Sequence, residues 1–259
     1  MAADPVGFDL DLATSLAATA LRGGRGLVAQ PGGRRPPLLF ELYEFEGCPY
    51  CRLVREALTE LDLDALVYPC PKGGKRYRGR VVELGGKMQF PYFVDPNTGR
   101  AMYESADIIA YLFETYGPGE LPLHWQWIGL QQVASGIAGL WRASAGRRVD
   151  HRPAQRVPAQ PLELYSFESS PFARLVRERL SELELPYILR SCGRANARDW
   201  LPPMVRDALR IEVRPETVNR QALAARARRI SIPYLVDPNT GTEMGESRDI
   251  LEYLDRTYG

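Results

Sequence analysis

Charge of one sign and long apolar stretches are both scarce in this sequence. Its 259 residues carry 33 Lys and Arg against 32 Asp and Glu. Because basic and acidic residues are almost equal in number, neither nucleic acid nor an anionic membrane surface is expected as the main partner. No apolar run approaches the ~20 residues of a membrane-spanning helix. The first residues show no basic segment followed by an apolar core, so we expect no secretion signal and a cytoplasmic location.

Cysteine and histidine are also few. Four cysteines are too few for a disulfide scaffold in a chain of this length. Cys48 and Cys51 would supply only half of a tetrahedral zinc site, and the other cysteines and both histidines form no second spaced pair. We therefore predict no metal site. Cys48 and Cys51 are interpreted as a redox pair, with metal binding or plain packing as the alternatives.

The sequence contains an internal duplication. Residues 91–117 recur as 233–259 with 18 of 27 positions identical, and 52–56 recur as 174–178. The offset grows from 122 in the early part to 142 in the late part, so the second copy holds about 20 extra residues within 193–229. Self-similarity at this period predicts two copies of one folding unit.

Within a copy, the pattern is strand, helix, strand, variable helical segment, hairpin and helix. In the first copy we expect a strand over 38–45, a helix beginning at Pro49, a strand over 66–68, a hairpin turn over 95–99 and a helix over 105–116. Ser105 is the expected N-cap of the last helix and Gly117 its stop. This order of elements is that of a thioredoxin-type α/β domain.

A stretch of small residues precedes each copy, at Leu12–Leu16 and at Val133–Ile137. Each predicts a leading helix, followed by an Arg-, Gly- and Pro-rich linker. The predicted organisation is a helix and linker over 1–37, a first domain over 38–117, a helix and linker over 118–160, and a second domain over 161–259.

The dithiol pair lies where the first strand gives way to the first helix. There the unpaired N–H groups and the helix dipole favour a thiolate at Cys48, which is the attacking species in disulfide exchange. Cys51 lies one helical turn on and can displace a mixed disulfide from Cys48. The spacing therefore predicts Cys48 as nucleophile and Cys51 as resolving thiol.

Several short motifs together resemble a known family. Cys48-Pro49-Tyr50-Cys51 resembles the active-site tetrapeptide of dithiol glutaredoxins. The Phe90-Pro91 step resembles the cis-proline of the thioredoxin superfamily, and Glu104-Ser105-x-Asp107 resembles the end of the glutathione-transferase N-terminal domain. In this order the motifs are similar to the glutaredoxin-like, glutathione S-transferase N-terminal domain family. The resemblance covers 38–117 and 161–259.

The resemblance implies a glutathione site in the first domain. Ser105 and the N-terminus of its helix would hold the γ-glutamyl carboxylate, Glu104 or Asp107 would face the ammonium, and the Phe90 backbone before Pro91 would pair with the cysteinyl backbone. Tyr50 would complete the site. Glutaredoxins usually carry a lysine shortly before the first cysteine, and here Glu44-Phe45-Glu46-Gly47 stands instead. The resemblance therefore assigns no partner to the glycine end of glutathione.

The second copy lacks both thiols, because Ser170 replaces Cys48 and Ala173 replaces Cys51. Thiol exchange is therefore impossible there. A candidate pocket for glutathione or a similar thiol peptide comprises Ser170, Ile232, Pro233, Glu246 and Ser247. A degenerate copy that serves only as scaffold is the favoured alternative. Cys70 and its counterpart Cys192 are predicted to be buried packing residues, and the Arg-rich insertion within 193–229 to be a solvated face.

Three functions are compatible with these motifs. Only 43 residues, 118–160, separate the two domains, too few for the helical domain of a complete glutathione transferase. The favoured interpretation is an oxidoreductase that uses glutathione as co-substrate and reduces a small or protein disulfide. A glutathione transferase and a non-enzymatic glutathione-binding or iron–sulfur adaptor are the alternatives, although proline in the motif disfavours the cluster. Homodimer formation stays open.

Overall fold

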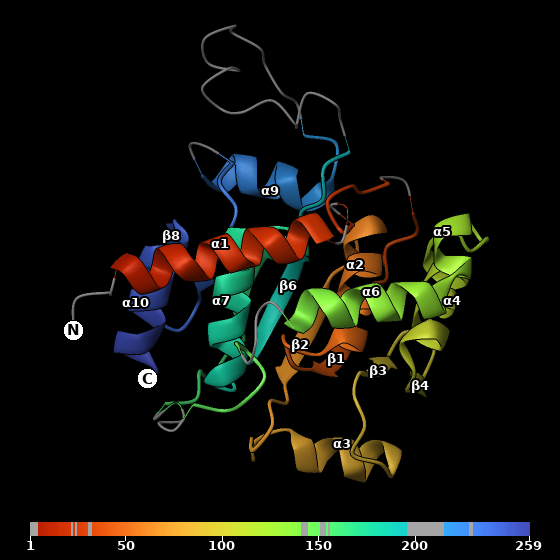
Figure 1. The fold of residues 1–259 in the computed structure, drawn as a ribbon, viewed down its shortest axis with the longest axis horizontal. Helices are drawn as coiled ribbons and strands as arrows, with labels where there is room; N and C mark the ends of the chain where they lie inside the picture. The colour runs from red at the N-terminus through yellow and green to blue at the C-terminus, as the bar shows by residue number, and fades with distance from the viewer. Residues whose placement is uncertain are drawn as a thin grey trace, which may run out of the picture.

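The described part of the chain forms one continuous sheet in the strand order β4-β3-β1-β2-β6-β5-β7-β8 (Figure 1). The computed structural model describes residues 5–21, 23, 25–30, 33–140, 145–150, 154, 156–195, 215–227 and 230–259. The strands are β1 (Phe40–Glu44), β2 (Ala65–Pro69), β3 (Tyr92–Asp95), β4 (Arg100–Met102), β5 (Leu162–Ser166), β6 (Tyr187–Ser191), β7 (Tyr234–Asp237) and β8 (Thr242–Gly245). The helices are α1 (Pro5–Leu21), α2 (Pro49–Glu60), α3 (Arg78–Gly85), α4 (Ser105–Tyr116), α5 (Leu123–Gln126), α6 (Ile128–Leu140), α7 (Pro171–Glu182), α9 (Val218–Arg226) and α10 (Ser247–Thr257).

Each repeat builds one half of this sheet. In the first half β1 runs parallel to β2 and antiparallel to β3, which pairs with β4, and β5 to β8 repeat the arrangement. Side chains alternate across a strand, so Phe40 and Leu42 enter the core beneath α2 and α4, whereas Tyr43 packs with Val81 of α3 on the other face. The predicted pair of thioredoxin-like α/β units is confirmed.

The two halves join edge to edge through β2 and β6. These strands pair antiparallel, with Leu66 opposite Ile188, its counterpart in the second repeat. Ala65 faces Leu189 and Val67 faces Tyr187, so the pairing has the self-complementary form of a two-fold interface. Because each strand covers the other's free edge, neither inner edge is left open for pairing with another chain.

The two predicted leading helices are present, but each covers the repeat that it does not precede. Helix α1 packs on α7 of the second repeat, and α6 packs on α2 of the first (Figure 1). Ser15 of α1 donates a hydrogen bond to the Pro171 carbonyl at 3.0 Å. Ser135 of α6 donates to the Pro49 carbonyl at 2.8 Å. The connections therefore cross, and each anchors the first turn of the helix that carries a candidate site.

A buried polar clip fixes each hairpin to its closing helix. Asp95, at the end of β3, accepts hydrogen bonds from the Tyr111 and Tyr116 hydroxyls, both at 2.5 Å. Burial opposes a carboxylate there, but these tyrosines lower the pKa of Asp95 below its usual range. Asp237 repeats the clip in the second half. It holds α4 and α10 against the hairpins from which they emerge.

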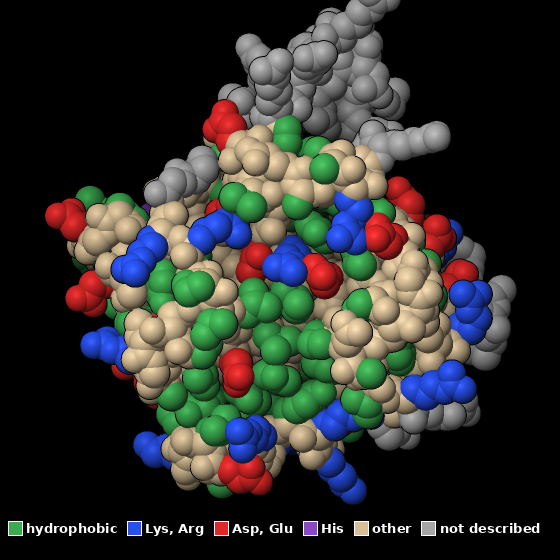
Figure 2. Space-filling view, turned by 180° about the vertical axis from the view of Figure 1, so that it is seen from behind, with side chains coloured by type: hydrophobic (Ala, Val, Ile, Leu, Met, Phe, Trp, Pro, Cys, Tyr) green, Lys and Arg blue, Asp and Glu red, His purple; other side chains and the backbone are tan. Residues whose placement is uncertain are grey.

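The back of the molecule differs from the helix-covered front. Seen from behind, apolar side chains gather over the centre of the sheet, with charged side chains mostly around them (Figure 2). In the first repeat, Tyr68, Val94 and Tyr103 are partly buried and pack against the cluster that contains Tyr43. Over the residues described, no helix has the length and apolar character needed to cross a membrane.

Candidate functional site

Three chain segments meet at one edge of the first half of the sheet. Because β3 runs antiparallel to β1, Pro91 before β3 lies beside the end of β1, from which the chain continues to Cys48. Because β4 runs antiparallel to β3, the chain leaves β4 at that same edge and enters α4 at Ser105. The Phe45 and Phe90 rings, with centroids 6.0 Å apart, pack between these segments.

The two thiols of the motif lie in different environments. Cys48 is the N-cap of α2, and its Sγ accepts the Cys51 N–H at 3.3 Å. Burial disfavours a thiolate at Cys48, but hydrogen bonds from Cys51 outweigh it and lower the pKa of Cys48. Cys51 is fully buried, and this burial raises its pKa well above the usual value. Cys48 thus has the lower pKa of the two thiols.

Ser105 presents a buried hydroxyl that lacks a partner. The residue is 2% exposed, and its Oγ makes no hydrogen bond in the structure. The prediction that Ser105 is the N-cap was wrong: Glu104 is the cap, with a φ of 63°, and makes no side-chain capping bond. This left-handed backbone turns the chain so sharply that Ser105 is already helical. Free N–H groups and an unsatisfied hydroxyl at a helix start suit an anionic ligand.

The other predicted residues of this site surround that position. Tyr50 is 47% exposed, Phe90 is partly buried, and the Phe90–Pro91 bond is cis. Glu104 and Asp107 are both exposed. The Glu104 carboxylate accepts a hydrogen bond from the Gln89 amide at 2.5 Å, a contact that no motif in the sequence indicated. The binding roles of these residues stay predictions.

The equivalent place in the second repeat is a defined pocket of about 200 Å³. Its lining comprises Phe172, Ser231, Ile232, Pro233, Glu246 and Ser247. Four of the five predicted residues therefore lie around one cavity. Ser170 instead caps α7, where its Oγ accepts the Ala173 N–H at 3.2 Å. Phe172, the counterpart of Tyr50, was missed because phenylalanine carries no recognisable chemistry there.

The comparison with known families decides the relationship. The model of the glutathione S-transferase N-terminal domain matches residues 42–120, 164–209 and 206–259. The chain belongs to this family. The match covers both repeats, and it divides within the extra residues of the second one. No curated protein and no solved structure matched the chain.

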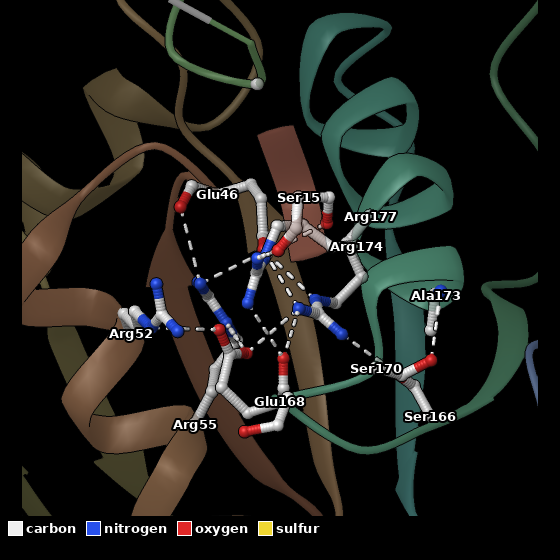
Figure 3. Close-up of polar contacts among 12 residues, drawn as sticks. Ser15, Glu46, Arg52, Arg55, Ser166, Glu168, Ser170, Ala173, Arg174 and Arg177 are labelled. Atoms are coloured by element: carbon white, nitrogen blue, oxygen red, sulfur yellow. Dashed lines mark hydrogen bonds and ion pairs between the residues drawn. The ribbon is translucent and has the colours of Figure 1, made fainter. Parts of the chain in front are cut away.

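This family member also contains a buried cluster of charges that joins its two repeats (Figure 3). It comprises Arg52, Arg55, Arg174 and Arg177 with Glu44, Glu46, Glu56 and Glu168. Arg55 of α2 reaches Glu168 of the second repeat at 2.8 Å, and Arg177 of α7 reaches Glu46 of the first at 3.0 Å. The ion pairs thus cross between the repeats, as the helices do.

The cluster sets the ionisation of its own members. Burial would raise the pKa of Glu168, but Arg177 and Arg55 beside it lower that pKa to about 2. Glu44 contacts Arg55, yet burial raises the pKa of Glu44 to about 7. The sequence contained a signal for this cluster, because the Arg-Leu-Val-Arg-Glu segment that marks the duplication also supplies the four arginines. Their burial was not predicted, since arginines on a helix are usually solvated.

The remaining sequence predictions are spread over the molecule. Cys70 and Cys192 are both buried, and burial raises the pKa of each thiol, as expected for packing residues. Among the residues described, no group of His, Cys, Asp and Glu is arranged to hold a metal ion. One of the two histidines, His151, and most of the Arg-rich insertion lie outside the described residues.

Proposed function

We propose that this protein is a glutathione-dependent thiol–disulfide oxidoreductase whose nucleophile is Cys48. The observation that carries the proposal is the inequality of the two thiols. Cys48 accepts the Cys51 N–H at the start of α2 and has a lowered pKa. A thiolate held at a helix N-terminus is the reactive form for exchange.

The proposed reaction begins on a glutathione mixed disulfide or a protein disulfide. The Cys48 thiolate attacks one sulfur, the disulfide bond breaks, and the departing thiolate takes a proton. A mixed disulfide on Cys48 remains. When the mixed disulfide is with glutathione, a second glutathione thiolate attacks the glutathione sulfur, Cys48 leaves as the thiolate, and oxidised glutathione is formed. When the mixed disulfide is with a protein, Cys51 attacks the Cys48 sulfur, the protein thiolate leaves and takes a proton, and two glutathione molecules then reduce the Cys48–Cys51 disulfide and leave as oxidised glutathione.

The unpartnered Ser105 hydroxyl supports glutathione as the co-substrate. Together with the free N–H groups at the start of α4, Ser105 is suited to a carboxylate. The exposed Glu104 and Asp107 carboxylates are suited to the ammonium of the same γ-glutamyl group. We propose that glutathione binds across this helix start with its sulfur toward Cys48.

The test combines two assays. Reduction of a small dialkyl disulfide, coupled to glutathione oxidation, should be lost in Cys48→Ser and retained in Cys70→Ser, a matched control that removes a buried thiol elsewhere. Conjugation of glutathione to a chlorinated nitrobenzene measures the transferase alternative. Disulfide reduction that survives in Cys48→Ser would overturn the oxidoreductase proposal. Conjugation without disulfide reduction would favour a transferase.

The pocket of the second repeat supports a separate binding role. Its volume of about 200 Å³ and its lining by Glu246 and Ser247 repeat the helix start of the first site without a thiol. We propose that it binds glutathione or a related thiol peptide without exchange. Calorimetry on Cys48→Ser should then give two glutathione sites, and Ser247→Ala should remove one. If calorimetry gives a single glutathione site and Ser247→Ala leaves it intact, the second repeat is a scaffold that binds no glutathione.

A further inference from the structure

The connection between the two repeats brings two basic residues to the first repeat. Residues 145–150 of this connection run beside the segment that follows β2, where the Lys72 N–H donates to the Arg147 carbonyl at 2.8 Å. The Val149 N–H donates back to the Lys72 carbonyl at 3.0 Å, and Lys72 forms a parallel bridge with Arg148. Three exposed cations thus lie together, and the term basic patch denotes Lys72, Arg147 and Arg148.

The basic patch lies beside the nucleophile of the first site. Because β2 runs parallel to β1, the chain leaves both strands at the same edge of the sheet, toward Lys72 and Cys48 respectively. Arg147 lies directly against Gly47, the residue before Cys48, since a methyl group on Gly47 would lie 2.9 Å from the Arg147 Cβ. Only glycine permits so close an approach of the two chain segments. The basic patch therefore flanks Cys48 on its β2 side, whereas Pro91 lies on its β3 side.

The second repeat has the same backbone contacts with less charge. There the Arg194 N–H donates to the Leu27 carbonyl at 2.8 Å, and the Ala29 N–H donates to the Arg194 carbonyl at 3.1 Å. Val28 takes the place of Arg148 in the parallel bridge. The fold thus accepts leucine and valine at these two positions, so the backbone contacts do not require the two arginines of the first repeat.

The charge of the basic patch is not neutralised within the part of the chain that the structure describes. None of its three side chains forms an ion pair there. The acidic residue that follows on the same segment, Asp150, pairs with Arg179 instead, at 2.6 Å. Neighbouring like charges repel one another, and an anionic partner relieves that repulsion. The basic patch is therefore suited to an acidic ligand beside the reactive thiol.

We propose that the basic patch docks an acidic segment of the protein disulfide that Cys48 reduces. This inference rests on the oxidoreductase function proposed above. The three cations lie exposed on two chain segments, so they suit several carboxylates of a polypeptide better than the single carboxylate at one end of a small thiol. Opposite charges raise the rate of encounter and fix the orientation in which the partner's sulfur meets Cys48. The connection to the second repeat thereby completes the substrate surface of the first.

Two synthetic peptides that differ only in charge test the proposal. Each contains one cysteine as its 2-pyridyl disulfide, flanked by glutamates in one peptide and by glutamines in the other. The Cys48 thiolate attacks the peptide sulfur, the disulfide bond breaks, and the departing pyridine-2-thiolate takes a proton and is followed by its absorbance as the thione. With the reduced full-length protein at low ionic strength, the acidic peptide should react about 10-fold faster than the neutral peptide. This advantage should shrink as the salt concentration approaches ~0.15 M, because salt screens exposed charges.

Replacing the two arginines by the residues of the second repeat separates charge from structure. In the double variant Arg147→Leu, Arg148→Val, the advantage of the acidic peptide should fall to about 2-fold, whereas the rate with the neutral peptide should stay close to wild type. A matched control, Arg226→Gln with Arg256→Gln, removes the same charge from exposed positions of the second repeat. It should keep the full advantage.

The outcomes distinguish docking from the reaction itself. Equal rates for the two peptides in wild type, an advantage that survives in the double variant, or equal slowing of both peptides would each overturn the docking proposal. If the double variant slows only the 2-pyridyl disulfide of glutathione, the basic patch binds glutathione and the docking proposal is wrong. Thione release from neither peptide in wild type would instead overturn the oxidoreductase function. If circular dichroism shows that the double variant does not fold, the exposed charge reversal Arg148→Glu replaces it and should remove most of the advantage of the acidic peptide.

Discussion

The two sites of this protein share one backbone arrangement, their frame, and differ in the reactive side chains that it holds. Both lie where a strand passes into a proline-started helix, and each faces a cis-proline and a helix that begins after a glutamate with φ near 63° or 64°. In the first site that frame holds Cys48 and Cys51. In the second it holds Ser170, which caps its helix with a geometry close to that of Cys48.

This comparison separates what the fold requires from what the reaction requires. The polar clips, the crossed helices and the arginines are retained in both repeats, so they belong to the frame. The two thiols and the Glu44 carboxyl occur in the first repeat only, because Ser170, Ala173 and Ser166 replace them in the second. Function in such a duplicated chain is therefore best sought at the positions where two otherwise equivalent environments diverge.

The largest predicted effect comes from moving the chemistry into the second repeat. In a Cys48→Ser, Cys51→Ser background, glutathione-coupled disulfide reduction should be absent. Adding Ser170→Cys and Ala173→Cys should restore the first attack, because the α7 N-terminus offers a new thiolate the same hydrogen bond that Cys48 receives. Rapid mixing with a coloured disulfide measures release of the first thiolate.

That transfer has its own control. A second repeat that stays inert with both substitutions, while circular dichroism shows it folded, would mean that the two frames are not equivalent. The pocket of about 200 Å³ beside Ser247 would then be a binding site of another kind.

The sequence predicted much of each repeat but little of what joins them. Local signals were sufficient for the hairpin, where Asp95 and Gly99 suit the turn, and for the helix after Pro49. Nothing in Pro5–Leu21 indicates that α1 covers the second repeat, because its small residues would pack on either one. The motif Glu44-Phe45-Glu46-Gly47 was noticed only for the lysine that it lacks. One of its partners, Arg55, lies nearby in the sequence, but another, Arg177, lies more than a hundred residues away, and no local pattern encodes such a contact.

The next largest effect concerns the arginines of the buried cluster. Arg177→Met leaves the Glu46 and Glu168 carboxylates without one of their main partners, and uncompensated buried charge typically costs about 3–5 kcal/mol. Arg55→Met removes an ion-pair partner from three carboxylates, because Arg55 contacts Glu44 as well as Glu46 and Glu168. It should destabilise the protein at least as much. Urea unfolding gives both free energies.

An exposed ion pair provides the reference for these losses of unfolding free energy. Arg226 and Glu243 form an ion pair in which both side chains are 37% exposed, so Arg226→Met should cost less than about 1 kcal/mol. If Arg177→Met and Arg226→Met were equally mild, the crossed ion pairs would not be what fixes one repeat against the other.

The pH dependence of stability should also distinguish Glu44 from Ser166. A carboxyl whose pKa rises from 4.5 to about 7 on folding binds more protons in the folded state between these values. The free energy of unfolding therefore falls as pH rises from 4.5 to 7 and levels off above. Relative to Glu44→Gln, the wild type should lose stability between pH 5 and 7.5 in urea unfolding, whereas Ser166→Ala should show no such trend. A flat difference would place the Glu44 pKa near its ordinary value.

The smallest predicted effect tests the crossed helices as a matched pair. Ser15→Ala and Ser135→Ala each remove one hydrogen bond to a proline carbonyl, at 3.0 Å and 2.8 Å, and each should cost about 1 kcal/mol of unfolding free energy. Their effects on thiol chemistry should differ, because Ser135 anchors the turn that carries Cys48 and Ser15 anchors the turn without a thiol. The rate of Cys48 alkylation by iodoacetamide should therefore change in Ser135→Ala only. An equal change in Ser15→Ala would mean that motion in one site reaches the other through the shared charge cluster, and the two repeats would then be one functional unit.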